Sequence, residues 1–257
     1  MKQMDLSEME VFMKTKADVS ATVLRAMKVL KYLKEAPGPQ SVSYISKDLD
    51  LSPTIVHRLL TTLKMEGFVF QDAQSKLYSL GAVFLDYANK IVNELPFAPI
   101  VEPWLLQLRN TSEETVGFYI PNGHTRLCLM EYESRQEIRR SVGVGTQLPI
   151  YAGATGRAII SFQSEQRQKQ ILNGLSKEER AVVQQKIVVT QQYGYSVSLE
   201  EISANVSAIS APVFDQQKRV VGAISISGPA FRFNDEKIAE VVPDLLHATA
   251  EVSKSFI

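Results

Sequence analysis

The segment from Ser52 to Glu66 constrains the fold of this chain more than any other, because both its start and its two faces can be recognised. Ser52 is suited to cap a helix, and Pro53 suits the first helical position, where a missing N–H group is tolerated. Apolar residues recur at helical spacing and predict a buried stripe of Val56, Leu59, Leu60 and Leu63. The remaining faces carry Thr54, His57, Arg58, Thr61 and Thr62. Such a polar face is suited to contact the edges of DNA bases.

The neighbouring segments turn this helix into part of a larger motif. Ser43 is expected to cap a preceding short helix, which a tight turn at Asp50 joins to Ser52. After the helix, two apolar-rich runs, Phe68 to Gln71 and Lys76 to Ser79, flank a polar turn and predict a β-hairpin. Together these elements predict a winged helix-turn-helix. The alternative is an ordinary amphipathic surface helix.

Charge supports contact between this region and nucleic acid. Residues 14 to 80 hold ten Lys or Arg against six Asp or Glu, a net of +4, in a chain whose formal net charge is +0. A first helix is predicted from Ala21 to Glu35, with Arg25 available to a phosphate. We expect Thr54, His57, Arg58 and Thr61 to enter the major groove, with Ser52 at the start of the helix and Lys76 on the wing touching the backbone or the minor groove.

Composition limits the class of protein. The chain has 257 residues and 45% hydrophobic content, enough for one large or two modest domains. No apolar run approaches the roughly 20 residues that span a bilayer, so we expect a soluble protein with no membrane partner. The single cysteine, Cys128, lies in a predicted buried strand and has no internal disulfide partner. A structural thiol in a reducing cytoplasm is the expected setting.

The middle of the chain predicts a linker between two domains. A helix is expected from Leu80 to Asn93, and its apolar stripe could pack against a second subunit or against its own domain. We expect a flexible tail over residues 1–18, a DNA-binding domain over 19–79, a dimerisation linker over 80–95 and a second domain over 96–257.

The second domain predicts a mixed α+β fold. After a helix over Val101 to Thr111, strands are expected over Thr115 to Tyr119, Arg126 to Tyr132 and Ile138 to Val142. Helical segments follow, and then come strands near Ser196, from Ser207 to Phe214 and from Arg219 to Ser227. A closing helix is capped by Asn234. Because strands and helices do not alternate regularly, an α+β sensor-like domain is favoured over a doubly wound sheet.

Two segments of this domain could hold a small molecule. Leu148 to Ala158 leads a loop into a helix start made of small residues, where backbone N–H groups favour an anion such as a carboxylate. The alternative is that the small residues only allow tight packing. In the strand Ala223 to Gly228, Ser225 and Ser227 share one face and could orient a small acid or simply face water.

Catalysis is the rival class of function. His57, His124 and His247 are the only histidines, and they stand far apart without metal-ligand spacing. No phosphate-binding or dinucleotide-binding glycine loop is present. We therefore expect no enzyme activity, no metal and no cofactor. A third possibility is a DNA-binding protein whose C-terminal domain only forms oligomers.

With these residues in view, the chain resembles the IclR family of bacterial transcription regulators from Ser20 to its C-terminus. The resemblance rests on six segments in the family's order and spacing: Arg25 to Leu30, Ser52 to Leu63, Tyr78 to Gly81, Gly156 to Ala158, Ser210 to Asp215 and Ile224 to Pro229. It implies an N-terminal winged helix, a helical linker that dimerises and a C-terminal GAF-like effector domain. It also implies a double-stranded DNA operator with a near-palindromic sequence and a homodimer that can pair into a tetramer, and it leaves repression or activation open.

The resemblance also implies an effector pocket. Carried over position by position, its lining here would be Leu148, Ala154, Thr155, Ser198, Ala208, Ser225 and Ser227. Family members that bind small oxo-acids often have an acidic side chain where this chain has Ser198, some have cysteine in place of Ala208, and Asn205 replaces a frequent glycine. Loss of that carboxylate removes one acceptor and one negative charge. We therefore expect a small organic acid as effector but do not assign glyoxylate or pyruvate.

Overall fold

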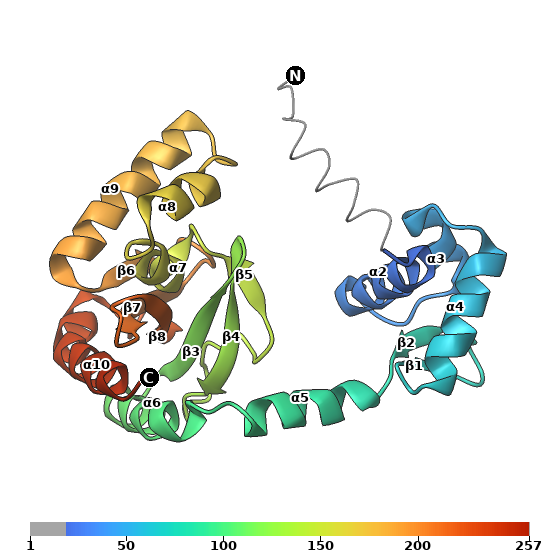
Figure 1. Ribbon diagram of the computed structural model, residues 1–257. Helices are drawn as coiled ribbons and strands as arrows, with labels where there is room; N and C mark the ends of the chain where they lie inside the picture. Colours follow the sequence, from blue (N-terminus) through green and yellow to red (C-terminus); the bar gives the residue numbers. More distant parts are fainter. Residues whose placement is uncertain (1–18, 257) are drawn as a thin grey trace. The chain divides into compact units, whose positions relative to one another are not determined.

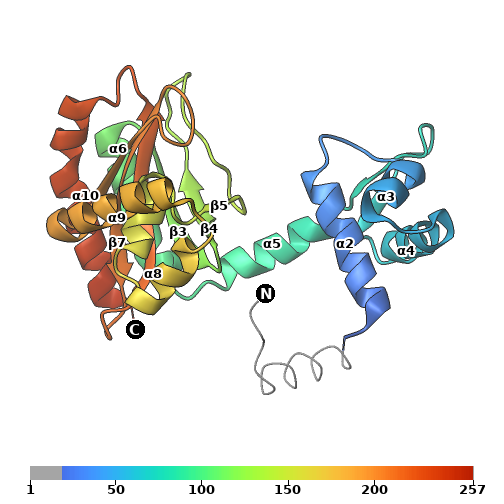
Figure 2. The ribbon, with the colours of Figure 1, turned by 90° about the horizontal axis from the view of Figure 1, so that it is seen from above.

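The computed structural model describes residues 19–256, and the chain divides into two compact units after Glu94. The tail expected over residues 1–18 lies outside the described residues. From residue 19 onward, the first unit contains three helices, a two-stranded hairpin and a further helix: α2 (Ala21–Glu35), α3 (Val42–Leu49), α4 (Pro53–Met65), β1 (Val69–Gln71), β2 (Tyr78–Leu80) and α5 (Val83–Asn93). Helices α2, α3 and α4 lie side by side (Figure 1, Figure 2).

The first unit folds around the stripe predicted for α4. Val56, Leu59, Leu60 and Leu63 are buried, and they join residues of α2, α3 and the hairpin in one core. Ser52 caps α4 and accepts a hydrogen bond from the Ile55 N–H at 3.4 Å. The turn between α3 and α4 passes through Asp50 in the left-handed region, at φ +50°. A winged helix-turn-helix is therefore confirmed as the fold of this unit.

Two boundaries in this unit differ from the sequence-based expectation. Ser41, not Ser43, caps α3, because Ser41 has extended backbone and accepts from the Tyr44 N–H at 3.3 Å. Ser43 lies one residue inside the helix. The next helix, α5, begins at Val83 rather than Leu80, because Leu80 pairs with Val69 in the hairpin.

Helix α5 uses its apolar stripe in two ways. Phe84 packs edge-on against Phe68 at 5.5 Å between ring centroids, so part of the stripe belongs to its own unit. Leu85, Tyr87 and Ile91 are exposed in the single chain.

The second unit is a six-stranded antiparallel sheet between two layers of helices (Figure 1). Its strands are β3 (Thr115–Asn122), β4 (Thr125–Tyr132), β5 (Gln147–Pro149), β6 (Ser196–Leu199), β7 (Val206–Phe214) and β8 (Val220–Pro229), in the order β5-β4-β3-β8-β7-β6. One face packs against α6 (Ala98–Ser112) and α10 (Asp235–Ser255). The other packs against α7 (Gly153–Ile160), α8 (Glu165–Leu172) and α9 (Lys177–Tyr193). The mixed α+β class is confirmed.

The strand expected over Ile138 to Val142 is wrong. This stretch is a loop, because the Glu131 carboxylate accepts the N–H groups of Val142 and Gly143, the latter at 2.8 Å, and the Ser141 hydroxyl at 2.7 Å. A side chain therefore satisfies the backbone groups that a strand would have paired. The short strand β5, which the sequence pattern did not reveal, pairs with β4 instead.

Candidate DNA interface and effector cavity

The outer face of α4 is polar and open. Thr54, His57, Arg58, Thr61 and Thr62 are all exposed, whereas the stripe behind them is buried. The hydroxyl groups of Thr61 and Thr62 donate to the carbonyl oxygens of His57 and Arg58 at 2.9 and 3.1 Å, which leaves their oxygens available as acceptors. This face can therefore present both hydrogen-bond donors and acceptors to base edges.

Two arginines extend this face toward α2. Arg25 and Arg58 line a shallow hollow of about 170 Å³ between α2 and α4, together with Thr22, Ile55, Leu59 and Thr62. No ion pair joins either guanidinium to a carboxylate among residues 19–256. The hollow is therefore basic, and its two guanidinium groups are available to bind a DNA phosphate.

The wing is tied to the end of α4. The Asp72 carboxylate accepts the Ser75 N–H at 2.7 Å and shapes the turn, and exposed Lys76 follows in the left-handed region at φ +59°. Gln71 links the hairpin to α4, since Lys64 Nζ donates to its side-chain oxygen at 3.0 Å. The structure thus holds six of the predicted DNA-contact residues, Arg25, Thr54, His57, Arg58, Thr61 and Lys76, as exposed groups on α2, α4 and the wing, while the hydroxyl of Ser52 serves as the cap.

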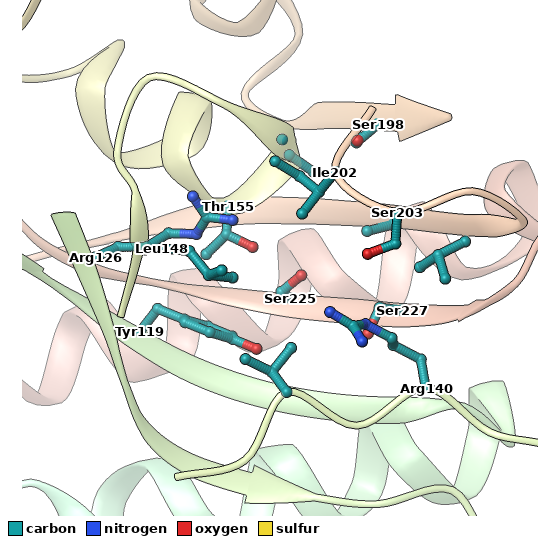
Figure 3. A pocket seen from close by; sticks show the side chains of 15 residues that line it. Tyr119, Arg126, Arg140, Leu148, Thr155, Ser198, Ile202, Ser203, Ser225 and Ser227 are labelled. Carbon is teal, nitrogen blue, oxygen red and sulfur yellow. The ribbon is translucent and has the colours of Figure 1, made fainter. Parts of the chain in front are cut away.

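The second unit contains a small cavity beside the start of α7 (Figure 3). Its volume is about 50 Å³. All seven residues predicted for the pocket line it, from β5, α7, β6, β7 and β8: Leu148, Ala154, Thr155, Ser198, Ala208, Ser225 and Ser227.

The serines of β8 divide as their alternation predicts. Ser225 and Ser227 face the cavity, while Ile224 and Ile226 are fully buried in the core beneath α6 and α10. The Ser225 hydroxyl donates to the Ile209 carbonyl at 3.1 Å, so its oxygen can still accept a hydrogen bond from a ligand.

The small residues at the start of α7 serve both of the roles considered for them, ligand access to backbone N–H groups and tight packing. Its cap residue, Ala152, has no side chain that accepts the first N–H groups, and Gly153, Ala154 and Thr155 line the cavity. One turn later the small residue serves packing, because a Cβ on Gly156 would lie 2.4 Å from the Ile150 carbonyl oxygen. Uncapped N–H groups at a helix start attract an anion.

Sequence reasoning missed the charged residues of this cavity. Arg126 and Arg140 both line it, together with Tyr119, Val142, Gly153, Ile202, Ser203 and Val206. The sequence could have indicated that Arg126 is buried, because Arg126 lies two residues before the buried Cys128 and strand alternation places both side chains on the same face. Arg140 lies in the segment mistaken for a strand, and nothing in its local pattern places it at the cavity.

Arg126 is buried without a carboxylate partner. Only 3% of it is exposed, and its guanidinium donates to the carbonyl oxygens of Pro149 and Ala152, the latter at 2.9 Å. Its Nε has no hydrogen-bond partner, and none of the ion pairs formed within residues 19–256 includes it. Burial lowers the pKa of Arg126 to about 10, so the group remains a cation at neutral pH. Burying a cation without a negative partner is energetically costly, so binding of an anion beside Arg126 is favoured.

The loop above the cavity is anchored by an ion pair between a buried arginine and a more exposed glutamate. Arg157 of α7, 2% exposed, contacts Glu201 at 2.5 Å, and Lys186 contacts the same carboxylate at 2.8 Å. Ile202 and Ser203, the next residues, line the cavity. Asn205 follows at φ +61°, a conformation in which glycine or asparagine is favoured.

These features define a DNA-binding regulator with a ligand cavity in a separate unit. Two family models match: the bacterial transcriptional regulator IclR C-terminal family over residues 89–254 and the IclR helix-turn-helix domain over residues 22–73. The chain therefore belongs to the IclR family, as a DNA-binding transcriptional regulator with a C-terminal effector-binding domain.

Known relatives agree over most of the chain. HTH-type transcriptional regulator KipR of Bacillus subtilis is 28% identical over 91% of this chain and 96% of its own length. Transcriptional repressor IclR of Escherichia coli is 26% identical over 91% of this chain and 89% of its own. The structure of an IclR transcriptional regulator from Alicyclobacillus acidocaldarius is 25% identical over 92% of this chain and 98% of its own, with a TM-score of 0.81. These relatives are regulators, which confirms regulation rather than catalysis.

No group of three or more His, Cys, Asp or Glu side chains within residues 19–256 is arranged to hold a metal ion. In the same part of the chain, no helix has both the length and the apolar character needed to cross a membrane.

Proposed function

We propose that this regulator binds a near-palindromic operator as a homodimer and that a small carboxylate in the cavity changes its operator affinity. Arg126 carries the effector part of this proposal, because a buried guanidinium without a carboxylate partner beside uncapped N–H groups favours a small anion. The ligand acts by binding one domain arrangement better than another, which shifts operator affinity by about 1–3 kcal/mol.

On the DNA side, α4 enters the major groove with Thr54, His57, Arg58 and Thr61, while Arg25 and Lys76 contact the backbone or the minor groove. The exposure of these side chains and the absence of acidic residues from the hollow between α2 and α4 support this assignment. The exposed residues Leu85, Tyr87 and Ile91 of α5 support a dimer, because pairing two copies would remove them from water. Two such dimers would give a tetramer.

The proposal is tested by measuring binding to the DNA flanking the protein's own gene. Fluorescence anisotropy with labelled fragments and an excess of random competitor should reveal one preferred fragment, and short carboxylic acids should change its Kd by about 5- to 150-fold. A steep dependence on salt would report phosphate contacts. Preference without any response to acids or other metabolites would support a domain that only forms oligomers, and no preference at all would refute the proposal.

A further inference from the structure

The charged side chains that line the cavity are all positive. Fifteen residues line it, and these described residues include two arginines and no Asp or Glu. Tyr119 adds no negative charge, because burial raises the pKa of its phenol well above the usual value. The lining therefore carries two positive charges and the positive end of α7, with no built-in anion to balance them.

The two arginines approach the cavity from opposite sides. Figure 3 shows the guanidinium of Arg126 near Thr155 and that of Arg140 near Ser227, with Ser225 between them. Arg126 comes from β4, whereas Arg140 comes from the loop between β4 and β5. One compact anion at either end would leave the other cation unmatched.

The loop that carries Arg140 is held in place at that residue and at the residues that follow it. The Arg140 carbonyl accepts a hydrogen bond from the Thr115 hydroxyl, and the Glu131 carboxylate binds the next residues, Ser141 at 2.7 Å and Gly143 at 2.8 Å. The Arg140 side chain itself is half-buried and forms no ion pair with residues 19–256. The backbone position of Arg140 is therefore set by the fold before any ligand arrives.

We propose that the effector is a short dicarboxylate, with one carboxylate at Arg126 and the start of α7 and the other at Arg140. This inference rests on the proposed function of the cavity and specifies the charge of the ligand. The hydroxyl of Ser225, between the two ends, and those of Ser198 and Ser203 elsewhere in the lining can bind polar substituents.

The size of the cavity limits the length of that dicarboxylate. A volume of about 50 Å³ holds about three to five water molecules. The loop above it is fixed by the ion pair between Arg157 and Glu201. A chain of two to four carbons is therefore favoured over aromatic or long-chain acids.

The test compares ligands of equal length that differ by one charge. Isothermal titration of the full-length protein with succinate, monomethyl succinate and butyrate, and with malonate and oxalate as shorter diacids, measures each Kd. At least one diacid should bind about 10- to 100-fold more tightly than its monoanionic analogue, because a hydrogen bond to a charged group is lost in the latter. Inorganic phosphate, a compact anion, should bind no better than the monoanions.

Two arginine variants then separate the ends of the cavity. Arg140→Gln should abolish the advantage of diacids and leave monoacid binding unchanged. Arg139→Gln is the matched control, because Arg139 is an exposed neighbour paired with Glu133 at 2.5 Å and does not line the cavity. Arg126→Gln should weaken both kinds of acid, and its melting temperature without ligand shows whether the fold survives; the Arg140 variant tests the proposal in either case.

The outcomes distinguish this inference from the proposed function. If monoacids bind as tightly as diacids and change operator affinity, or if Arg140→Gln retains the diacid advantage, the dicarboxylate inference is overturned while the cavity remains an effector site. If no acid binds but an uncharged metabolite changes operator affinity, the assignment of an acidic ligand fails for both. If no small molecule binds, the effector role itself fails.

Discussion

Replacing Arg58 with alanine should remove sequence discrimination at one base pair of each operator half-site. The side chain is exposed on α4 and forms no ion pair or side-chain hydrogen bond with residues 19–256. Its removal leaves no buried group unsatisfied, so folding stability should change by no more than about 0.5 kcal/mol. A bidentate contact with guanine contributes about 1–3 kcal/mol of discrimination, or about 5- to 150-fold in Kd for one half-site.

The assay measures discrimination rather than affinity alone. Anisotropy titrations would compare the wild type and Arg58→Ala on the operator and on a set of single base-pair variants of it. The wild type should lose affinity at a guanine position to which Arg58→Ala is insensitive. In a homodimer both half-sites lose the contact, so the penalties for well-separated sites should add.

Arg25→Ala is the matched comparison, since Arg25 lines the same hollow but is assigned to phosphate. That variant should weaken all DNA fragments similarly and reduce the salt slope by about 1 for each lost contact. If Arg58→Ala keeps the full discrimination of the wild type at every position, α4 does not read bases through this residue and the recognition-helix assignment is wrong.

Three further predictions concern folding and the cavity. Leu60→Ala removes a fully buried side chain from the core of the first unit and should cost about 2–5 kcal/mol, seen as faster hydrogen exchange there with little change in the second unit. Burial raises the pKa of the Cys128 thiol to about 12, so this thiol should resist alkylation until the protein unfolds. Because the thiol of the unfolded chain ionises at lower pH, the stability of the wild type should fall faster than that of Cys128→Ala as pH rises above about 9. Glu201→Gln leaves buried Arg157 without its charge partner and should lower stability by about 1–3 kcal/mol by calorimetry, whereas Lys186→Ala, which removes the more exposed partner, should cost less than about 1 kcal/mol; equal losses would contradict the role given to the pair.

Local signals in the sequence were sufficient at several elements where short-range chemistry decides the structure, although they assigned the cap of α3 to Ser43 instead of Ser41. The limits of α2 and the cap of α4 follow from side chains within three or four residues, and both agree with the structure. The alternation around Ser225 and Ser227 likewise assigned the two faces of β8. The positions of the seven pocket residues came from family resemblance, which carries tertiary information that a single sequence pattern lacks.

Two of the failures share one cause, which is competition for backbone groups by partners that local periodicity does not reveal. The stretch from Ile138 to Val142 has a strand-like composition, but the Glu131 carboxylate accepts the Val142 N–H, and the Arg140 carbonyl accepts from the Thr115 hydroxyl, 25 residues away. Leu80 continues a helical pattern, but pairing with Val69 draws it into the hairpin. Periodicity describes the spacing of side chains and not the partners of backbone groups, so it predicts the wrong element in both places.

The cavity shows how such long-range contacts bear on function. Position 198 holds a serine, so no carboxylate balances Arg126 and Arg140 among the lining residues. The carbonyl oxygens of Pro149 and Ala152 offset part of the cost of burying Arg126, and an anionic ligand would offset more of it by supplying the missing negative charge. Because the Arg126 guanidinium donates to the carbonyl of Ala152, the residue that starts α7, an anion bound there would act on both β4 and α7. A ligand that supplies this charge is thus positioned to alter the packing of α7 on the sheet, which gives effector binding a structural route out of the cavity.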